Sequence, residues 1–266
     1  MKRSSPTSAR RNENRSWISP KKLAEEALVA LKRKADPKRA EGAQKYFKEA
    51  VKVLGLAAAD SRALAESLYQ KVKGRWSIDQ AVELADILLL SPYLEAKHQA
   101  IHVLGRFMRG ARPEHFPKMR SWFEADLLDN WASTDVFCGE VLTPFLEKYP
   151  EFGTKLKGWT KAKNMWVRRA SAVALVTPAR HGESLDLAYE VAGRLRDNKE
   201  DLMHKACGWL LREAGKTDMP RLEKYLLKNG PKIPRTTVRY AIERFEAKKR
   251  KYLLQATRPQ PGVPFS

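Results

Sequence analysis

Apolar residues recur along most of the chain at the three- and four-residue spacing of amphipathic helices. The spacing predicts helices over residues 23–34, 43–54, 61–72 and 78–90, and the pattern continues to residue 250. Short breaks with turn-forming residues separate these segments, among them Asp36-Pro37, Ser91-Pro92 and Tyr149-Pro150. No alternating β-branched stretch stands out. The pattern therefore predicts an all-α protein with negligible strand content.

Three of the predicted helices share one register of polar, basic, small and apolar residues. They are EAKHQAIHVLGRF (95–107), WVRRASAVAL (166–175) and LMHKACGWLL (202–211). Ala170 and Ala206 are 36 residues apart, as are Trp166 and Leu202, and a helix pair with two turns occupies about this length. Small residues at the repeated position let helix pairs pack closely. We expect a curved α-solenoid of HEAT-like helical repeats with a concave face. An irregular helical bundle is the alternative.

The charge of the chain is concentrated at its two ends. The 266 residues include 51 Lys and Arg against 31 Asp and Glu, a formal net charge of +20. Residues 1–45 hold 13 basic and 5 acidic side chains (13 − 5 = +8), and residues 228–266 hold 10 and 2 (10 − 2 = +8). Such an excess favours a polyanionic partner, either nucleic acid or an anionic membrane surface. Two solvated tails are the simpler alternative.

The ends of the chain also differ from its centre in composition. Residues 1–16 and 256–266 are rich in Pro, Ser and Arg and lack an apolar period. We therefore expect a flexible basic tail at 1–16, a single HEAT-like repeat domain at 17–255 and a flexible tail at 256–266. The N-terminus lacks the apolar segment of a secretion signal, and no apolar run approaches the ~18 residues that cross a bilayer. We expect a cytoplasmic protein, nucleoid-associated if bacterial, that is not secreted and has no membrane partner.

Common catalytic signatures are missing from the sequence. It has no GxGxxG, GxxxxGK[ST] or GxSxG motif, so several nucleotide-binding and hydrolase classes are set aside. His98 and His102 are four residues apart, but no carboxylate follows His98 as HExxH requires, so we expect no metal site. The two cysteines exclude a disulfide scaffold, and Cys207 is interpreted as a small core residue.

Tryptophans beside charged residues give the most informative chemical pattern. Trp131 and Asp135 are four residues apart, on one face of a helix that we expect to begin near Asn130. The repeat predicts that this helix lies beside the other two segments that combine Trp with Arg. Aromatic faces and guanidinium groups suit a nucleotide, and a lone Asp there suits a cationic sugar or a water molecule. Trp122 and Trp159 are interpreted as core residues. The candidate site residues are Trp131, Asp135, Trp166, Arg168, Arg169, Trp209 and Arg212.

These segments resemble the HEAT-like-repeat DNA alkylation repair glycosylases, the AlkD family, over about residues 31–250. The likeness is carried by WASTDVFCGEVLTPFLEKYPE, WTKAKNMWVRRASAVAL and KACGWLLREAGK, and more loosely by DPKRAEGAQKYFKEAVKVLGL. The family's active-site pattern is a Trp followed four residues later by an Asp, then the Arg of WxxRA and the Trp of GWxLRE. It falls here on Trp131, Asp135, Arg169 and Trp209.

The resemblance implies base-excision repair of double-stranded DNA that contains cationic N-alkylated purines such as 3-methyladenine and 7-methylguanine. It also implies that the base is not flipped into a pocket and that no metal or organic cofactor takes part. Catalysis would fall on Asp135, Trp131 and Trp209, in a protein expected to act as a monomer. The residues expected to bind DNA are Arg169, Arg168, Arg212 and Trp166.

Two other classes of function remain as hypotheses. One is a non-catalytic HEAT-like protein that recognises bent or branched DNA, and the other is a protein–protein scaffold with incidental basic ends. The intact set of Trp131, Asp135, Arg169 and Trp209 favours the glycosylase, because a protein that only binds DNA gains nothing from an acid in its groove. The net charge of +20 disfavours the scaffold.

Overall fold

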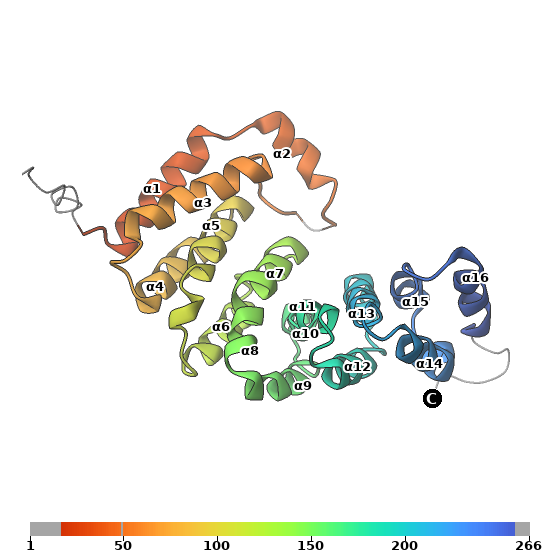
Figure 1. The fold of residues 1–266 in the computed structure, drawn as a ribbon. Helices are drawn as coiled ribbons and strands as arrows, with labels where there is room; N and C mark the ends of the chain where they lie inside the picture. Colours follow the sequence, from red (N-terminus) through yellow and green to blue (C-terminus); the bar gives the residue numbers. More distant parts are fainter. Residues whose placement is uncertain (1–16, 49, 259–266) are drawn as a thin grey trace, which may run out of the picture.

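The computed structural model describes residues 17–48 and 50–258, and helices form nearly all of their regular structure (Figure 1). Within these ranges the β-structure is a single isolated bridge between Lys52 and Tyr93. The prediction of an all-α fold is confirmed. The tail expected at residues 1–16, and residues 259–266 of the expected C-terminal tail, lie outside the described residues. No helix in the described part of the chain is both long enough and apolar enough to cross a bilayer.

The helices follow a curved path in two rows (Figure 1). Each helix of the inner row contacts the next one in that row. The inner row consists of α3 (Ala58–Val72), α5 (Leu94–Gly105), α7 (Trp131–Phe137), α10 (Met165–Val173), α13 (Asp201–Ala214) and α15 (Arg235–Ala241). The other α-helices are α1 (Pro20–Arg33), α2 (Pro37–Gln44), α4 (Ile78–Leu89), α6 (His115–Glu124), α8 (Thr143–Lys148), α9 (Leu156–Trp159), α11 (Val176–Arg180), α12 (Leu185–Arg194), α14 (Met219–Asn229) and α16 (Ala247–Ala256). Short 3₁₀ segments are η1 (Met108–Gly110), η3 (Pro150–Lys155) and η4 (Gly230–Lys232), and η2 (Cys138–Leu142) is a π-helix between α7 and α8.

Side-chain hydrogen bonds join neighbouring repeats over separations close to the predicted 36 residues. The indole Nε1 of Trp122 donates to Asp86 Oδ1 at 2.7 Å, 36 residues away. The hydroxyl of Thr143 donates to the carbonyl of Ala174 at 2.9 Å, 31 residues away. The segments 95–107, 166–175 and 202–211 all fall on the inner row, on α5, α10 and α13. The prediction of a curved helical solenoid is therefore confirmed.

The core runs continuously between the two rows, and small residues set how closely the helices approach. Trp122 and Trp159 are buried, as predicted, and Cys207 lies buried in α13. A Cβ on Gly208 would collide with Tyr240, so the glycine lets α13 and α15 pack in close contact. Close packing of adjacent repeats is what stabilises a solenoid, because each repeat buries its apolar face only against its neighbours.

One predicted helix is wrong. Residues 43–54 were expected to be helical, but α2 ends at Gln44, and residues 45–48 and 50–56, here called the strap, are not helical. The buried carboxylate of Glu95 accepts hydrogen bonds from the N–H groups of Leu54, Gly55 and Leu56 at 2.8–3.3 Å. Gly55 has φ +84°, which favours glycine. Backbone N–H groups of the strap thus donate to a carboxylate about forty residues away instead of to carbonyl groups within a helix.

The predicted start of the C-terminal tail at residue 256 is too early. Thr257 is fully buried, and its hydroxyl donates to the carbonyl of Leu253 at 2.6 Å. Arg235 Nη1 donates to both oxygens of Thr257 at 3.0 and 3.1 Å. The residues that end α16 are therefore part of the folded domain, packed against α15.

Candidate active site

The residues of the predicted Trp–Asp pair lie where the sequence places them. Asn130 begins α7, because its side-chain oxygen accepts from the N–H of Ser133 at 2.9 Å, as an N-cap residue does. Trp131 is the first residue of the helix, and Asp135 lies one turn further on. Both therefore belong to α7, which lies in the middle of the inner row (Figure 1).

Asp135 forms a two-point ion pair with Arg169 of α10. Arg169 Nε donates to Asp135 Oδ1 at 2.9 Å, and Nη2 donates to Oδ2 at 2.8 Å. The third nitrogen, Nη1, donates to the carbonyl of Leu202 at the start of α13. The Arg169 side chain is 6 % exposed and that of Asp135 is 18 % exposed. Arg169 thus links three helices of the inner row and has each of its nitrogens bound within the chain.

Burial governs the electrostatics of this pair. It raises the pKa of Asp135 above the ordinary value of 3.8, while the charge and the hydrogen bonds of Arg169 act in the opposite direction. A carboxylate held by one guanidinium retains acceptor capacity, because each oxygen accepts more than one hydrogen bond. The pair therefore places a fixed acceptor in a site that is largely shielded from water.

A cavity of about 360 Å³ lies beside the pair. Four of the predicted site residues line it, namely Trp131, Arg169, Trp209 and Arg212, whereas Asp135 is joined to it through Arg169. The other lining residues are Tyr46, Leu202, Lys205 and Tyr240. Lys205 is paired with Asp201 at 2.9 Å, and this partner raises the pKa of the lysine. Arg212 is paired with Glu213 and Glu243. Aromatic rings and cations thus surround one hollow.

The strap supplies a wall of this cavity that the sequence did not predict. Tyr46 lines the cavity and is 78 % exposed. Phe47 stacks on Trp131, with ring centroids 5.4 Å apart and an interplanar angle of 24°. The indole Nε1 of Trp131 donates to the carbonyl of Tyr46 at 3.4 Å. Because residues 43–54 were expected to be helical, the periodic pattern gave no signal that these aromatic residues reach α7.

Two predicted site residues lie elsewhere. Trp166 was expected to contact DNA, but it is 7 % exposed and belongs to the core. Arg168 was expected to contact DNA as well, but its side chain binds Asn198 Oδ1, Glu200 and the carbonyls of Ala162 and Lys163. Neither residue lines the cavity. Arg168 instead ties the loop before α10 to the loop before α13.

Comparison with known families covers this whole site. The model of the family described as DNA alkylation repair enzymes matches residues 27–245, a range that includes Asp135 and every residue that lines the cavity. The chain belongs to the DNA alkylation repair enzyme family. Membership supports an enzymatic role in the repair of alkylated DNA, and with it DNA binding.

Solved structures share the fold of this family member. One, described as a predicted DNA alkylation repair enzyme from Enterococcus faecalis, has a TM-score of 0.70 and 17% sequence identity, covering 80% of this chain and 98% of that chain. Another, smu.31 from Streptococcus mutans UA159, has a TM-score of 0.53 and 17% identity, covering 91% of this chain and 100% of that chain. At this identity the likeness shows the fold alone. No curated protein matches the sequence.

Proposed function

We propose that this member of the family is a monofunctional, monomeric DNA glycosylase. It excises cationic N-alkylated purines, such as 3-methyladenine and 7-methylguanine, from duplex DNA. The observation that carries the proposal is the cavity lined by Trp131, Trp209 and Arg169, whose guanidinium holds the Asp135 carboxylate. A net charge of +20 supports a duplex as the partner.

The chemistry of the lesion fits what these side chains supply. An N-alkylated purine already carries a positive charge, so it leaves as a neutral base when the bond to C1′ breaks and the bonding electrons go with the base. The sugar that remains is an oxocarbenium-like cation. Trp131 and Trp209 offer aromatic faces to this cation, and the Asp135 carboxylate stabilises it and accepts the proton of the water that adds to C1′. No general acid is needed, and as the resemblance implies, the base stays outside a pocket.

Arg169 is assigned to Asp135 rather than to a DNA phosphate. Its three nitrogens donate to Asp135 and to the Leu202 carbonyl, and its side chain is 6 % exposed. A residue this enclosed suits the fixed orientation of a carboxylate, because charge stabilisation in a transition state depends on groups that are held in place beforehand. Arg212, at 20 % side-chain exposure, is the more accessible guanidinium at the cavity.

One observation favours the alternative, a non-catalytic protein that recognises bent or branched DNA. Both oxygens of Asp135 are bound by Arg169, so the charge of the carboxylate is partly compensated before any substrate arrives. A protein that only binds DNA would tolerate such a neutral pair in its groove. The two functions therefore differ in whether the Asp135 charge acts on the rate of base release.

Single-turnover release of 7-methylguanine and 3-methyladenine from alkylated duplex DNA separates the two. Asp135→Asn is expected to slow excision by roughly 10²–10³-fold, as for loss of one fixed electrostatic group. DNA affinity is expected to hold or rise, because Arg169 then carries an uncompensated positive charge. Asp197→Asn is the matched control, since Asp197 is 81 % exposed and pairs with its neighbour Arg196. No excision by the parent would support the non-catalytic alternative, whereas excision by Asp135→Asn at the parental rate would show that the charge of Asp135 does not act on base release.

A further inference from the structure

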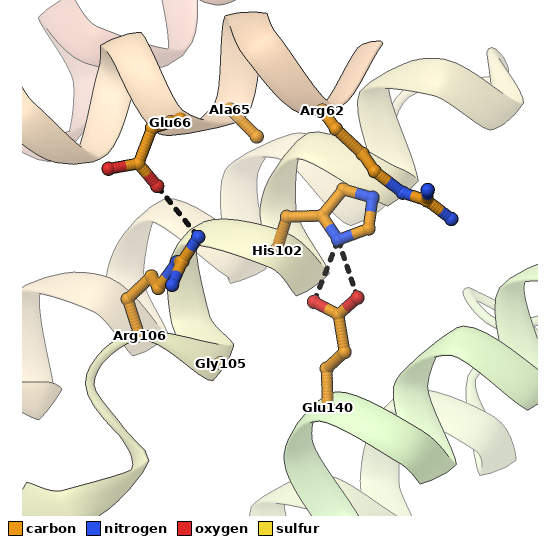
Figure 2. A pocket seen from close by; sticks show the side chains of 7 residues that line it. All are labelled: Arg62, Ala65, Glu66, His102, Gly105, Arg106 and Glu140. Atoms are coloured by element: carbon orange, nitrogen blue, oxygen red, sulfur yellow. Dashed lines mark hydrogen bonds and ion pairs between the residues drawn. The ribbon is translucent and has the colours of Figure 1, made fainter. Parts of the chain in front are cut away.

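A second cavity, of about 350 Å³, lies one step along the inner row from the candidate active site, between α3, α5 and η2 (Figure 2). The helix that carries Trp131 and Asp135 continues into η2 and supplies Glu140 to this cavity. The lining residues are Arg62, Ala65, Glu66, His102, Gly105, Arg106 and Glu140. None of them belongs to the residue set assigned to base excision above.

The ring of His102 is held in one orientation at this cavity. Both carboxylate oxygens of Glu140 lie 2.7–2.8 Å from His102 Nδ1. A carboxylate only accepts, so the proton is on Nδ1. Glu140 lies in a π-helix, a local feature found frequently at functional sites, and a Cβ on Gly105 would lie 3.0 Å from the Glu140 carbonyl. The absence of a side chain at Gly105 thus lets η2 approach α5 closely enough for this contact.

Most charged side chains around His102 have a partner, but the side of the cavity that faces Arg62 does not. Arg106 pairs with Glu66 at 2.7 Å, and Glu140 is bound to His102. Arg62 is exposed and forms no hydrogen bond or ion pair with any described residue. The Nε2 of His102 likewise has no hydrogen-bond partner in the described part of the chain. In Figure 2 this nitrogen lies on the side of the ring that is turned toward Arg62.

We propose that this cavity binds a backbone phosphodiester of the duplex, with Arg62 and His102 as its contacts. Arg62 supplies a positive charge and several N–H donors in a geometry that matches a phosphate. His102 supplies a hydrogen bond from Nε2, so that in the complex it donates from Nδ1 to Glu140 and from Nε2 to the phosphate. The proposal rests on the proposed function, because it takes duplex DNA as the ligand. It extends the DNA-binding surface from α7 toward α3.

The test is equilibrium binding of an undamaged DNA duplex to the full-length protein as salt is varied. Arg62→Ala is expected to weaken binding about 5- to 20-fold near 0.1 M salt and to reduce the log–log salt slope by about 1. His102→Phe is expected to weaken binding as well, because a phenyl ring donates no hydrogen bond to the phosphate. Arg33→Ala is the matched control, because Arg33 is also exposed, ends α1 and lines neither cavity.

Several outcomes would overturn the proposal. One is an Arg62→Ala protein whose affinity and salt slope match those of Arg33→Ala, with melting temperatures confirming that both are folded. Another is a folded His102→Phe protein that binds the duplex as tightly as the parent. Saturable binding of inorganic phosphate that Arg62→Ala abolishes, with unchanged duplex affinity, would assign the site to a free phosphate. Failure of the proposed function looks different, because the parent would then bind the duplex, with the Arg62 effect intact, and release no base.

Discussion

Replacement of Arg169 by Met tests whether this arginine holds Asp135 or a DNA phosphate. Met keeps an unbranched, largely apolar stem but removes every donor, so Asp135 and the Leu202 carbonyl lose their partner at once. Breaking a buried ion pair from one side typically costs about 3–5 kcal/mol. We expect the lower end, about 3 kcal/mol, because Asp135 is 18 % exposed and takes up a proton more readily once Arg169 is gone. That loss lowers the melting temperature by roughly 6–12 °C for a domain of this size.

Two further measurements on Arg169→Met, the excision rate and the salt slope of DNA binding, distinguish the two roles of this arginine. Excision is expected to fall at least as far as for Asp135→Asn, because a protonated carboxyl group stabilises no cation, whereas the salt slope of DNA binding is expected to stay that of the parent. Arg168→Met is the companion variant, since Arg168 binds Glu200 and Asn198 and lies outside the cavity, so stability falls and the excision rate holds. If Arg169→Met melted with the parent and its salt slope fell by about one, Arg169 would be a phosphate contact.

Three other predictions follow from the same contacts. Because burial raises the pKa of Asp135 above 3.8, the single-turnover excision rate is expected to fall on acidification while the pH is still above that value; a parental rate that is constant down to pH 4 would contradict this. Burial lowers the pKa of His98 to about 4 in the folded state, whereas in the unfolded state this histidine takes up a proton below about pH 6.5. The contribution of the neutral His98 to the free energy of unfolding is therefore complete above pH 6.5 and is lost as the pH falls toward 4. Urea unfolding at pH 7 and pH 5 should differ by about 2 kcal/mol more in the parent than in His98→Gln, and equal differences would show that His98 is protonated in the fold. Phe47→Ala removes the stack on Trp131, worth about 0.5–1.5 kcal/mol, so excision should slow by up to about tenfold and the melting temperature should fall by no more than about 6 °C. Phe47→Tyr should restore both, and a tenfold loss that Tyr does not restore would contradict a role for the stack.

The elements that periodicity specifies were predictable from the sequence. The 36-residue spacing placed α5, α10 and α13 in one row, and the cap at Asn130 placed the start of α7. The approach of Asp135 to Arg169 follows from the same spacing, since the two residues lie one repeat apart on adjacent helices. The spacing of residues along the chain was enough to predict these contacts, because the contacts of a solenoid join neighbouring repeats.

The parts that the sequence did not predict depend on partners far along the chain or on rotation about a helix. The strap has an apolar period that fits a helix, and it is kept from that form by Glu95, about forty residues away. Trp166 lies beside charged residues in the sequence, yet the turn of α10 directs it to the core. Arg168 and Arg169 are neighbours in sequence, but a helix step of about 100° sends them to different partners.

The strap also has a consequence for how the protein assembles. The hydrogen bond from Trp131 to the Tyr46 carbonyl spans 85 residues, more than twice the 36-residue repeat, whereas the repeats themselves close over short loops. Local pairs form early because little chain entropy opposes them, so the repeats can build outward from any nucleus. The strap docks only after α5 and α7 exist to receive it. We therefore expect its backbone amides to exchange with solvent through openings that leave the repeats intact, and we expect the cavity wall at Tyr46 to form last and to open first.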